Sequence, residues 1–338
     1  MVEAKRADRI RRLAAFGVAL AVVVVVLGAF TRLVDAGLGC PDWPGCYGHL
    51  LWPNTESEIA AANAAFPEDA EVDLDKTWPE MVHRYFAGSL LLLVAGIAYL
   101  STQATKAQRN LAYGLLVLII CQAAFGAWTV TLKLWPQVVT AHLLGGFATL
   151  SLLWAMYLRN GGGAAFHRPA SLAAGSRLAK LTLVAVIVQI ALGGWVSSNY
   201  AALACADFPT CYGSYWPDMD ASAGFNIFQG VGPNYLGGLL ASDARVAIHW
   251  THRLGAIVVT VLCLLLAWRL YAQHRLLAGV LIGVLTLQLL LGSLNVLWAL
   301  PLAVATAHNA VGALLLLVLV TVNFAPQKSP PSEAAHLA

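Results

Sequence analysis

Residues 13–30 read LAAFGVALAVVVVVLGAF, an apolar run without a charged side chain. A run of about 20 apolar residues is long enough to cross the hydrocarbon core of a bilayer as a helix. Similar runs recur along the chain, and we predict spanning helices over 13–33, 80–101, 110–132, 138–158, 178–198, 245–268, 275–297 and 302–323. The sequence therefore predicts an all-α polytopic membrane protein with eight transmembrane helices.

The composition supports this fold class. Of the 338 residues, 59% are apolar and only 11% are charged, whereas about a quarter of a soluble domain is charged. The net charge is +3 and no long basic block is present, which argues against nucleic acid as a partner. The first apolar run follows Lys5–Arg12 as a secretory signal would, but signal runs span only about 7–15 residues. We interpret it as the first transmembrane helix.

The basic residues predict the orientation. With the N-terminus inside, fourteen of the twenty Lys and Arg residues fall in cytoplasmic segments, as the positive-inside rule requires. We expect a multi-pass protein of the cell (plasma) membrane with both termini in the cytoplasm. The long loops 34–79 and 199–244 then face outside, and the polar tail 325–338 is expected to be disordered.

The two halves of the chain repeat each other. Residues 36–48, AGLGCPDWPGCYG, match residues 201–213, AALACADFPTCYG, at eight of thirteen positions. Further matches pair His83-Arg84 with His252-Arg253 and Thr140-Ala141-His142 with Thr306-Ala307-His308. We predict two tandem, parallel-repeat four-helix bundles, 10–160 and 178–324, joined by a cytoplasmic linker over 161–177.

Four histidines occupy equivalent positions in the two halves, namely His83 with His252 and His142 with His308. Each follows the outer start of a predicted helix by a few residues, which places the rings roughly 6–11 Å below the outer surface. His83 and His142 then lie at similar depth on parallel helices. Two imidazoles facing each other across a bundle form a bis-histidine site for haem iron.

Each of these histidines could instead be a hydrogen-bonded contact between helices, the role that we expect for Gln122 and Gln288. Ionisable residues at membrane depth are costly and rare, so two matched pairs favour a metal or haem site. Zinc is the weaker choice, because two ligands leave a tetrahedral site unfilled.

Charged residues next to the first histidine of each half suggest further roles. Arg84 and Arg253 lie where they could pair with a haem propionate or extend to the lipid headgroups. Glu80 precedes His83 by three residues, whereas His249 stands at the matching place in the second half. The halves thus differ at the site. Glu80 could act as a base or stabilise positive charge on a substrate, or be an ordinary residue near a helix N-terminus.

These motifs together resemble the haem A synthase family. The resemblance covers about residues 10–325 and is carried by the cysteine-containing outer loops, Glu80-x-x-His83-Arg84, Thr140-Ala141-His142 and their second-half counterparts. It implies oxidation of the C8 methyl of haem O to a formyl group, which gives haem A for terminal oxidases.

The resemblance also implies roles for the site residues. The N-terminal half would receive the substrate haem, with Glu80 catalytic and with His83, His142 and Arg84 binding haem O. The C-terminal half would hold a haem b cofactor through His252 and His308, with Arg253 as a propionate partner.

The four loop cysteines fit this picture. The outer side of the membrane is oxidising, and two cysteines six residues apart on a loop can form a disulfide. We predict Cys40–Cys46 and Cys205–Cys211 as structural disulfides, and a redox-active role for the first pair remains open. For Cys121 and Cys263 we expect plain apolar packing.

Two other functions stay open at this point. A quinol-linked electron-transfer cytochrome with two b haems would explain the histidines but gives Glu80 no role. A haem transporter is suggested by the parallel repeats, yet transporters usually break their helices near the midplane. The sequence does not say whether a haem O synthase, an oxidase-assembly factor or a second copy of the chain docks on the protein.

Overall fold

The structure is a computed structural model that describes residues 2–67, 71–162 and 177–324. Within these residues the regular structure is helical and includes no strand. Most of the predicted linker 161–177 and all of the predicted tail 325–338 lie outside the described residues.

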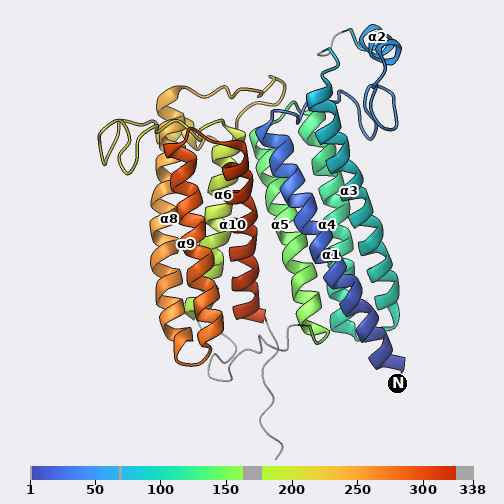
Figure 1. Cartoon of the computed structure of the whole chain (residues 1–338), viewed down its shortest axis with the longest axis vertical. Coiled ribbons are helices and arrows are strands. Elements are labelled where there is room, and N and C mark those ends of the chain that lie inside the picture. Colours follow the sequence, from blue (N-terminus) through green and yellow to red (C-terminus); the bar gives the residue numbers. More distant parts are fainter. Residues whose placement is uncertain (1, 68–70, 163–176, 325–338) are drawn as a thin grey trace, which may run out of the picture.

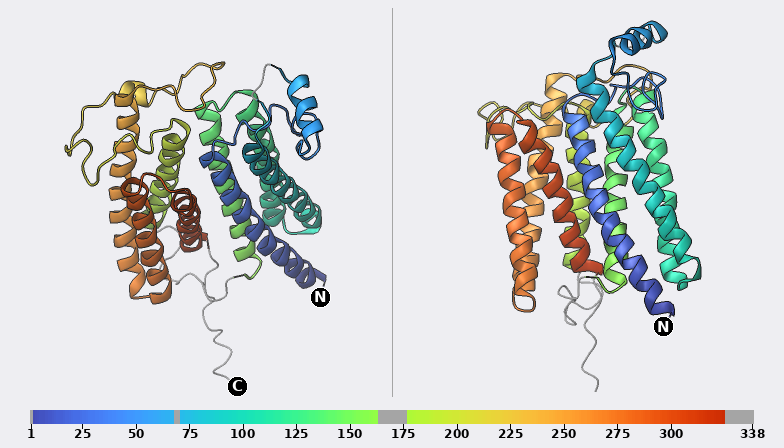
Figure 2. Two further views of the ribbon diagram at one scale, coloured as in Figure 1. Left: turned by 45° about the horizontal axis from the view of Figure 1, so that its top comes forward. Right: turned by 45° about the vertical axis from the view of Figure 1, so that its right-hand side comes forward.

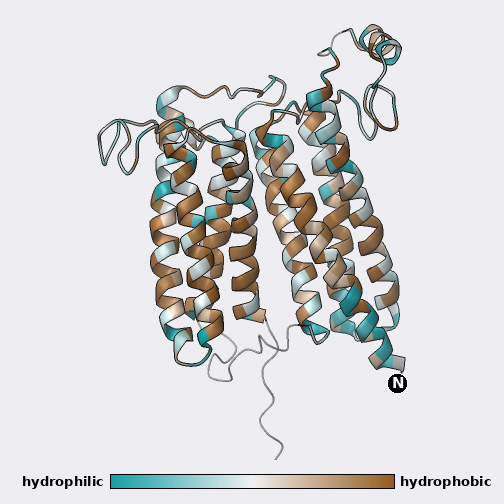
Figure 3. Ribbon diagram, in the orientation of Figure 1, coloured by the Kyte–Doolittle hydropathy of each residue, from teal (hydrophilic) through white to brown (hydrophobic). Residues whose placement is uncertain are grey.

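In the part of the chain that the structure describes, eight helices are long and apolar enough to cross a membrane, as predicted. They are α1 (Val2–Leu33), α3 (Leu74–Leu100), α4 (Lys106–Thr131), α5 (Pro136–Arg159), α6 (Arg177–Ser198), α8 (Ser242–Tyr271), α9 (Arg275–Leu297) and α10 (Leu302–Phe324). Three short elements join them, namely α2 (Glu56–Ala65), η1 (Ser101–Gln103) and α7 (Ala221–Gly224). Apolar residues dominate the middle of the spanning helices, and polar residues gather at their ends (Figure 3).

The spanning helices form two groups that lie side by side (Figures 1 and 2). Helices α1, α3, α4 and α5 pack on one another, as do α6, α8, α9 and α10. Between the groups, α1 contacts α10, α6 contacts α5, and α5 contacts α10. Two units related by an axis along the membrane normal would give this pattern of contacts, and the duplication itself stays a prediction.

The long loops lie at one end of the molecule, together with α2 and α7 (Figure 1). The start of α1 and the end of α10 lie at the opposite end. We call the loop end the outer end, in keeping with the predicted orientation. The site residues lie in the outer part of the helices, directly below these loops.

Two predicted helix starts were wrong. Helix α3 begins at Leu74 rather than at 80, because Asp73 caps it with its side chain, and Pro79 lies inside the helix rather than before it. Helix α1 begins at Val2 rather than at 13. Hydropathy detects the part of a helix that lies in lipid, and not its polar extension into water. His83 therefore lies about 14 Å along α3, farther from the helix start than predicted.

Polar contacts join the two groups at the outer end. The Arg32 guanidinium donates a hydrogen bond of 2.6 Å to the Ser197 carbonyl and lies 4.1 Å from the centre of the Tyr200 ring. The Tyr200 hydroxyl donates to Asp35 at 2.8 Å, and Asp35 also pairs with Arg32 at 3.2 Å. The two halves are therefore held together by charge as well as by apolar packing.

The two cysteines within helices differ in environment. Cys263 is fully buried among apolar side chains, as predicted. Cys121 is exposed on the surface of α4, within a helix that is apolar enough to span the membrane. The sequence pattern does not distinguish the two cysteines. Only the packing of α4 decides which of its faces meets lipid.

Candidate functional site

The first histidine pair meets between α3 and α5. The ring centres of His83 and His142 are 6.4 Å apart and their planes are inclined by 84°. With metal–nitrogen bonds of about 2 Å and about 1 Å from each nitrogen to its ring centre, a metal ion between two imidazoles separates the ring centres by about 6 Å. The pair therefore has the spacing that a single shared metal ion requires.

Three of the four site histidines have one buried ring nitrogen that no side chain or backbone group of the described residues pairs with. The Nδ1 atoms of His83, His142 and His308 are buried and have no hydrogen-bond partner among the described residues. Buried polar atoms are normally paired, and a histidine that only joined two helices would use its nitrogens for that purpose. These unpaired nitrogens favour imidazoles that bind a ligand.

The second pair lies on α8 and α10. His308 lies close enough to His252 to interact with it electrostatically. The Gln288 amide nitrogen lies 3.3 Å from Nε2 of His308, and the Gln122 amide donates to the backbone carbonyl of His142 at 2.7 Å. Gln122 thus joins α4 to α5 and Gln288 approaches α10 from α9, as the sequence predicted.

A glycine on a neighbouring helix faces each of the four histidine rings. A Cβ atom added at Gly28 would lie 2.9 Å from Cε1 of His83, and one added at Gly193 would lie 3.2 Å from Cε1 of His252. For Gly126 and His142 the distance would be 3.3 Å, and for Gly292 and His308 it would be 3.1 Å. A methyl group at any of these positions would press on the ring more closely than an ordinary van der Waals contact, so the glycines limit where the rings can lie.

Sequence reasoning missed Gly28 and Gly193 as site residues. The signal was available, because these glycines are 165 residues apart, the same offset that relates the two cysteine motifs. It also missed Gln189 on α6, whose amide nitrogen lies 3.1 Å from Nδ1 of His252.

Glu80 is buried and tied to the outer loop. One carboxylate oxygen accepts a hydrogen bond of 2.9 Å from the Cys40 backbone N–H, and the other pairs with Arg84 at 2.5 Å. Arg84 also donates to the backbone carbonyl of Asp42 at 2.9 Å. The carboxylate, the guanidinium and the start of the cysteine loop thus form one network directly above His83.

The second half builds the same network with a histidine. Nδ1 of His249 lies 3.2 Å from the Cys205 backbone nitrogen, and its Nε2 lies 3.2 Å from Nε of Arg253; a neutral imidazole accepts at one nitrogen only, so one of these two contacts is a hydrogen bond. Arg253 donates further to the carbonyls of Cys205 and Asp207 at 2.8 and 2.9 Å. Glu80 and His249 therefore occupy the same place in the two networks, and they differ in charge: Glu80 pairs with Arg84, whereas the carboxylate that acts on Arg253 is that of Asp207 in the loop.

The two arginines point into the loops in this structure. Both guanidinium groups are occupied by loop carbonyls. Their predicted role as propionate partners is not tested by these contacts. The contacts do show that Arg84 and Arg253, which directly follow His83 and His252, each hold an outer loop over the helices below it.

The predicted disulfides Cys40–Cys46 and Cys205–Cys211 are both present. Asp207 closes its loop by accepting hydrogen bonds from the Tyr212 and Gly213 backbone N–H groups and from the Thr210 hydroxyl. Led by the Thr210 hydrogen bond, these contacts lower the pKa of Asp207 to about 2. Asp42 accepts the corresponding backbone hydrogen bonds in the first loop.

The described residues include no group of three or more His, Cys, Asp or Glu side chains arranged to hold a metal ion. A metal bound by either histidine pair would therefore have two protein ligands. A porphyrin supplies the other four, so the donor set fits haem. Three observations support the fit to haem: the spacing of the His83 and His142 rings, the ring nitrogens without a partner, and the glycines beside the rings.

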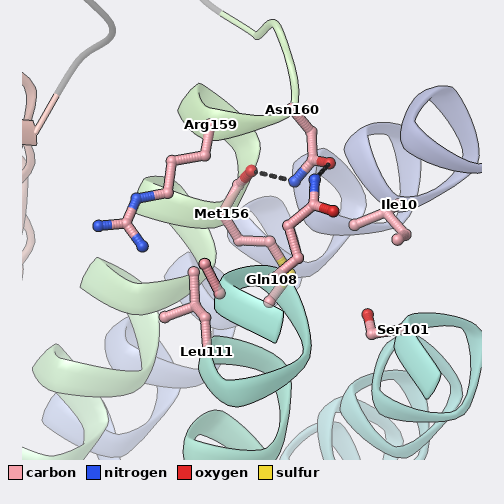
Figure 4. Close-up of a pocket in the computed structure, with 8 residues that line it drawn as sticks. Ile10, Ser101, Gln108, Leu111, Met156, Arg159 and Asn160 are labelled. Carbon is pink, nitrogen blue, oxygen red and sulfur yellow. Dashed lines mark hydrogen bonds between the residues drawn. The ribbon is translucent and has the colours of Figure 1, made fainter. Parts of the chain in front are cut away.

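A separate cavity lies at the other end of the N-terminal group. It has a volume of about 210 Å³ and is lined by residues that include Ile10, Ser101, Gln108, Arg159 and Asn160. Figure 4 shows the hydrogen bond between the Gln108 and Asn160 side chains that closes one wall, with Arg159 directed away from them. None of the site histidines lines it, so we do not include it in the candidate site.

Known proteins resemble the chain over nearly its whole length. It is 47% identical to the Heme A synthase of Shewanella oneidensis over 89% of this chain and 92% of that protein. The Heme A synthases of a Caulobacter species and a Chelativorans species are 29% and 28% identical, over 94% and 87% of this chain and 96% and 84% of theirs. Residues 11–320 match the COX15-CtaA family, which is described as cytochrome oxidase assembly protein. The chain therefore belongs to the COX15-CtaA family.

Proposed function

We propose that this protein is a haem A synthase, a membrane oxidoreductase that converts the C8 methyl of haem O to the formyl group of haem A. Its family and its 47% identity to a protein of that name support the assignment. The observation that carries it is the His83–His142 pair, whose ring centres lie 6.4 Å apart beneath a buried carboxylate.

The two halves of the protein have different roles. His83 and His142 bind the substrate haem in the N-terminal half, and His252 and His308 hold a haem b in the C-terminal half. Haem b supplies one-electron oxidation and reduction when bound. The matched positions of the two pairs support two sites, and the difference between Glu80 and His249 supports unequal roles.

Glu80 acts on the substrate side. Its carboxylate is fixed by the Cys40 N–H and by Arg84, and it lies about one helical turn before His83. A fixed carboxylate in a water-poor site stabilises positive charge that develops on a substrate. His249 cannot do this in the other half, because a neutral imidazole carries no compensating charge.

The distribution of the basic residues and the two disulfides support the proposed orientation. Both termini lie in the cytoplasm, and the two disulfide loops face the oxidising outer side. Reporter fusions that are active only in the cytoplasm should work after residue 338 and fail within the loop at 226–238. The reverse pattern would contradict this topology.

Extracted pigment tests the function directly. Membranes that make haem O and this protein should yield haem A, and the purified protein should contain haem b together with haem O or haem A. The variant Glu80→Gln should still bind haem and should lose haem A formation. If the protein contained haem b alone, and Glu80→Gln left haem A formation unchanged, an electron-transfer cytochrome would be the better assignment.

A further inference from the structure

We propose that the two disulfide loops rest in the lipid headgroup layer at the outer end of the protein, where exposed apolar side chains at their tips contact lipid. We call these side chains the loop-tip surface. It consists of Trp43, Leu50 and Leu51 in the first loop and Phe208, Tyr215 and Trp216 in the second. The proposal goes beyond the proposed function and does not depend on haem.

The tips of both loops are free of Asp, Glu, Lys and Arg. None of these residues occurs in 43–53 or in 208–217. By contrast, the segment 56–75 that follows the first tip contains seven acidic residues. The loop tips therefore differ from the charged segment beside them, which has the composition of a chain in water.

The loop-tip surface is exposed to the same extent in both halves. The offset of 165 that relates the two cysteine motifs pairs each of its members in the first loop with one in the second. The side chain of Leu50 is 87% exposed, and those of Tyr215 and Trp216 are each 71% exposed. Clustered large apolar side chains on a surface mark contact with a membrane or with another protein.

The first loop tip continues the lipid-facing surface of α3. Figure 1 shows the two loops at the outer end on opposite flanks, the first next to α3 and the second next to α8. The Tyr85 hydroxyl on α3 donates a hydrogen bond to the Leu50 backbone carbonyl, and the Tyr85 ring is itself exposed. Tyr85 lies about 7.5 Å inside the predicted span 80–101. The tip therefore reaches down beside the first turns of the apolar part of α3.

The second loop is held in the same way beside α8. Arg253 lies eight residues inside the predicted span 245–268, and it donates to the backbone carbonyls of Asp207 and Thr210 at 2.9 and 2.8 Å. Its guanidinium carbon lies 5.7 Å from the centre of the Phe208 ring. The second tip thus also lies against the outer turns of a spanning helix.

Both tips pair their backbone groups internally. Cys46 and His49 exchange two backbone hydrogen bonds of 2.9 and 3.0 Å, and Cys211 and Ser214 exchange two of 2.9 and 3.1 Å. Unpaired backbone groups are costly where water is scarce. The turns are therefore suited to the boundary between lipid and water.

Lipid fits this surface better than a partner protein does. The two tips lie on opposite flanks of the molecule (Figure 1), so one partner could not cover both, whereas lipid surrounds a membrane protein on all sides. Trp and Tyr, which supply three of the six side chains, are enriched at the boundary between membrane and water. Through Arg84 and Arg253, this contact would hold the loops at a fixed height above the site histidines.

The test places a fluorescent amino acid at Leu50 or at Tyr215 of the full-length protein in vesicles of phosphatidylethanolamine and phosphatidylglycerol. Ala61 is the matched control position, because it is exposed on α2 within the acidic segment. A phospholipid that carries a nitroxide on its headgroup should quench the probe several-fold more strongly at 50 and 215 than at 61. Iodide dissolved in the water should show the opposite order.

Charged substitutions next to the probe supply an independent variant. Leu51→Asp with the probe at 50, and Trp216→Asp with the probe at 215, should lower quenching by the nitroxide lipid and raise quenching by iodide, because a charged group is costly to transfer from water. Leu51→Met and Trp216→Phe keep an apolar side chain and should leave both values unchanged.

Two results would overturn the proposal. Quenching by iodide that is equal at 50, 215 and 61 would place the loops in water. Protection of 50 and 215 from both quenchers would place another protein, such as a second copy of the chain, over the loop tips. Neither measurement depends on haem A formation, so a failure here leaves the proposed function untouched.

Discussion

The four site histidines owe their positions to glycines on neighbouring helices. A Cβ atom added at any of these glycines would lie 2.9–3.3 Å from the ring, closer than an ordinary van der Waals contact. Ring and glycine come from different helices in every case, so helix packing and ligand placement depend on each other. Small residues at such positions let membrane helices approach closely.

Gly28→Ala and Gly193→Ala should each displace one histidine ring. The added Cβ would lie 2.9 Å from His83 or 3.2 Å from His252, and we expect haem affinity at the affected site to fall about 10–100-fold, as for other changes around a metal ligand. Haem content per protein, read from the Soret band, measures the effect. Gly96→Ala is the control, because a Cβ at that position of α3 has no neighbour within 4 Å. Equal haem content in all three variants would contradict the role of the glycines.

Glu80→Ala should destabilise the protein as well as inactivate it. The substitution leaves Arg84 as a buried charge without its partner, and removing one member of a buried ion pair typically costs about 3–5 kcal/mol. Glu80→Gln should cost less, because an amide oxygen still accepts the Cys40 N–H. Unfolding in mixed detergent micelles measures both values. A Glu80→Ala protein as stable as the parent would show that Arg84 finds other partners.

At the scale of elements, the two outer loops are built alike. Each contains a disulfide, an aspartate that accepts backbone N–H groups and an arginine from the helix below that donates to loop carbonyls. The loop therefore keeps its shape through local bonds and is anchored to the bundle by the residue that follows the first histidine. The loop and the site residues below it are therefore structurally connected.

The loop around Asp207 should loosen only in strong acid. Its folded pKa of about 2 lies below the ordinary value of 3.8, so the ionised carboxylate stabilises the loop fully above pH 3.8 and this contribution is lost as the pH falls toward 2. Hydrogen exchange of the Tyr212 and Gly213 amides, corrected for the intrinsic rate, should accelerate in that window. Asp207→Asn should remove this pH dependence, and a loop that loosens near pH 6 would contradict the assignment.

Replacing Cys40 and Cys46 by alanine should free the first loop. Closing a loop of this length stabilises the folded state by about 2 kcal/mol in the chain-entropy description, and Cys40 also supplies the N–H that holds Glu80. We expect faster proteolysis at the outer end and weaker haem A formation, whereas Cys121→Ala on the surface of α4 should change neither. A double variant that behaves like the parent would show that the hydrogen bonds alone hold the loop.

The whole molecule is held together along the seam between its two helix groups. Arg32 contributes a charged hydrogen bond to Ser197, a stacking contact with Tyr200 and an ion pair with Asp35. Its side chain is only 17% exposed, so solvent does not replace these contacts easily.

Arg32→Ala should therefore lower the stability of the whole molecule. A hydrogen bond to a charged group contributes about 1.5–3 kcal/mol, and we expect a loss of that order in detergent unfolding. Arg12→Ala is the matched control on the same helix, because that side chain is 77% exposed and surface ion pairs contribute about 0–1 kcal/mol. Equal stability of the two variants would mean that apolar packing alone holds the halves together.

The sequence by itself determined the class of the fold and the identity of the site histidines. Long apolar runs can satisfy their backbone hydrogen bonds in lipid only as helices. The positions of these runs therefore predict eight spanning helices without any tertiary information. The repeated motifs singled out His83, His142, His252 and His308 because an ionisable residue at membrane depth stands out against an apolar background. The two disulfides followed from cysteine spacing on the oxidising side.

Only the tertiary structure decided what surrounds those histidines. Gly28 and Gly193 share the offset of the repeat, but that they and Gln189 lie against a histidine ring appears only when neighbouring helices are packed together. The early start of α3 depends on the cap at Asp73, which hydropathy does not detect. Glu80 and His249 differ in chemistry and occupy the same network, because their partners come from loops distant in sequence. These contacts depend on the packing between helices, which the periodicity of the sequence does not reveal.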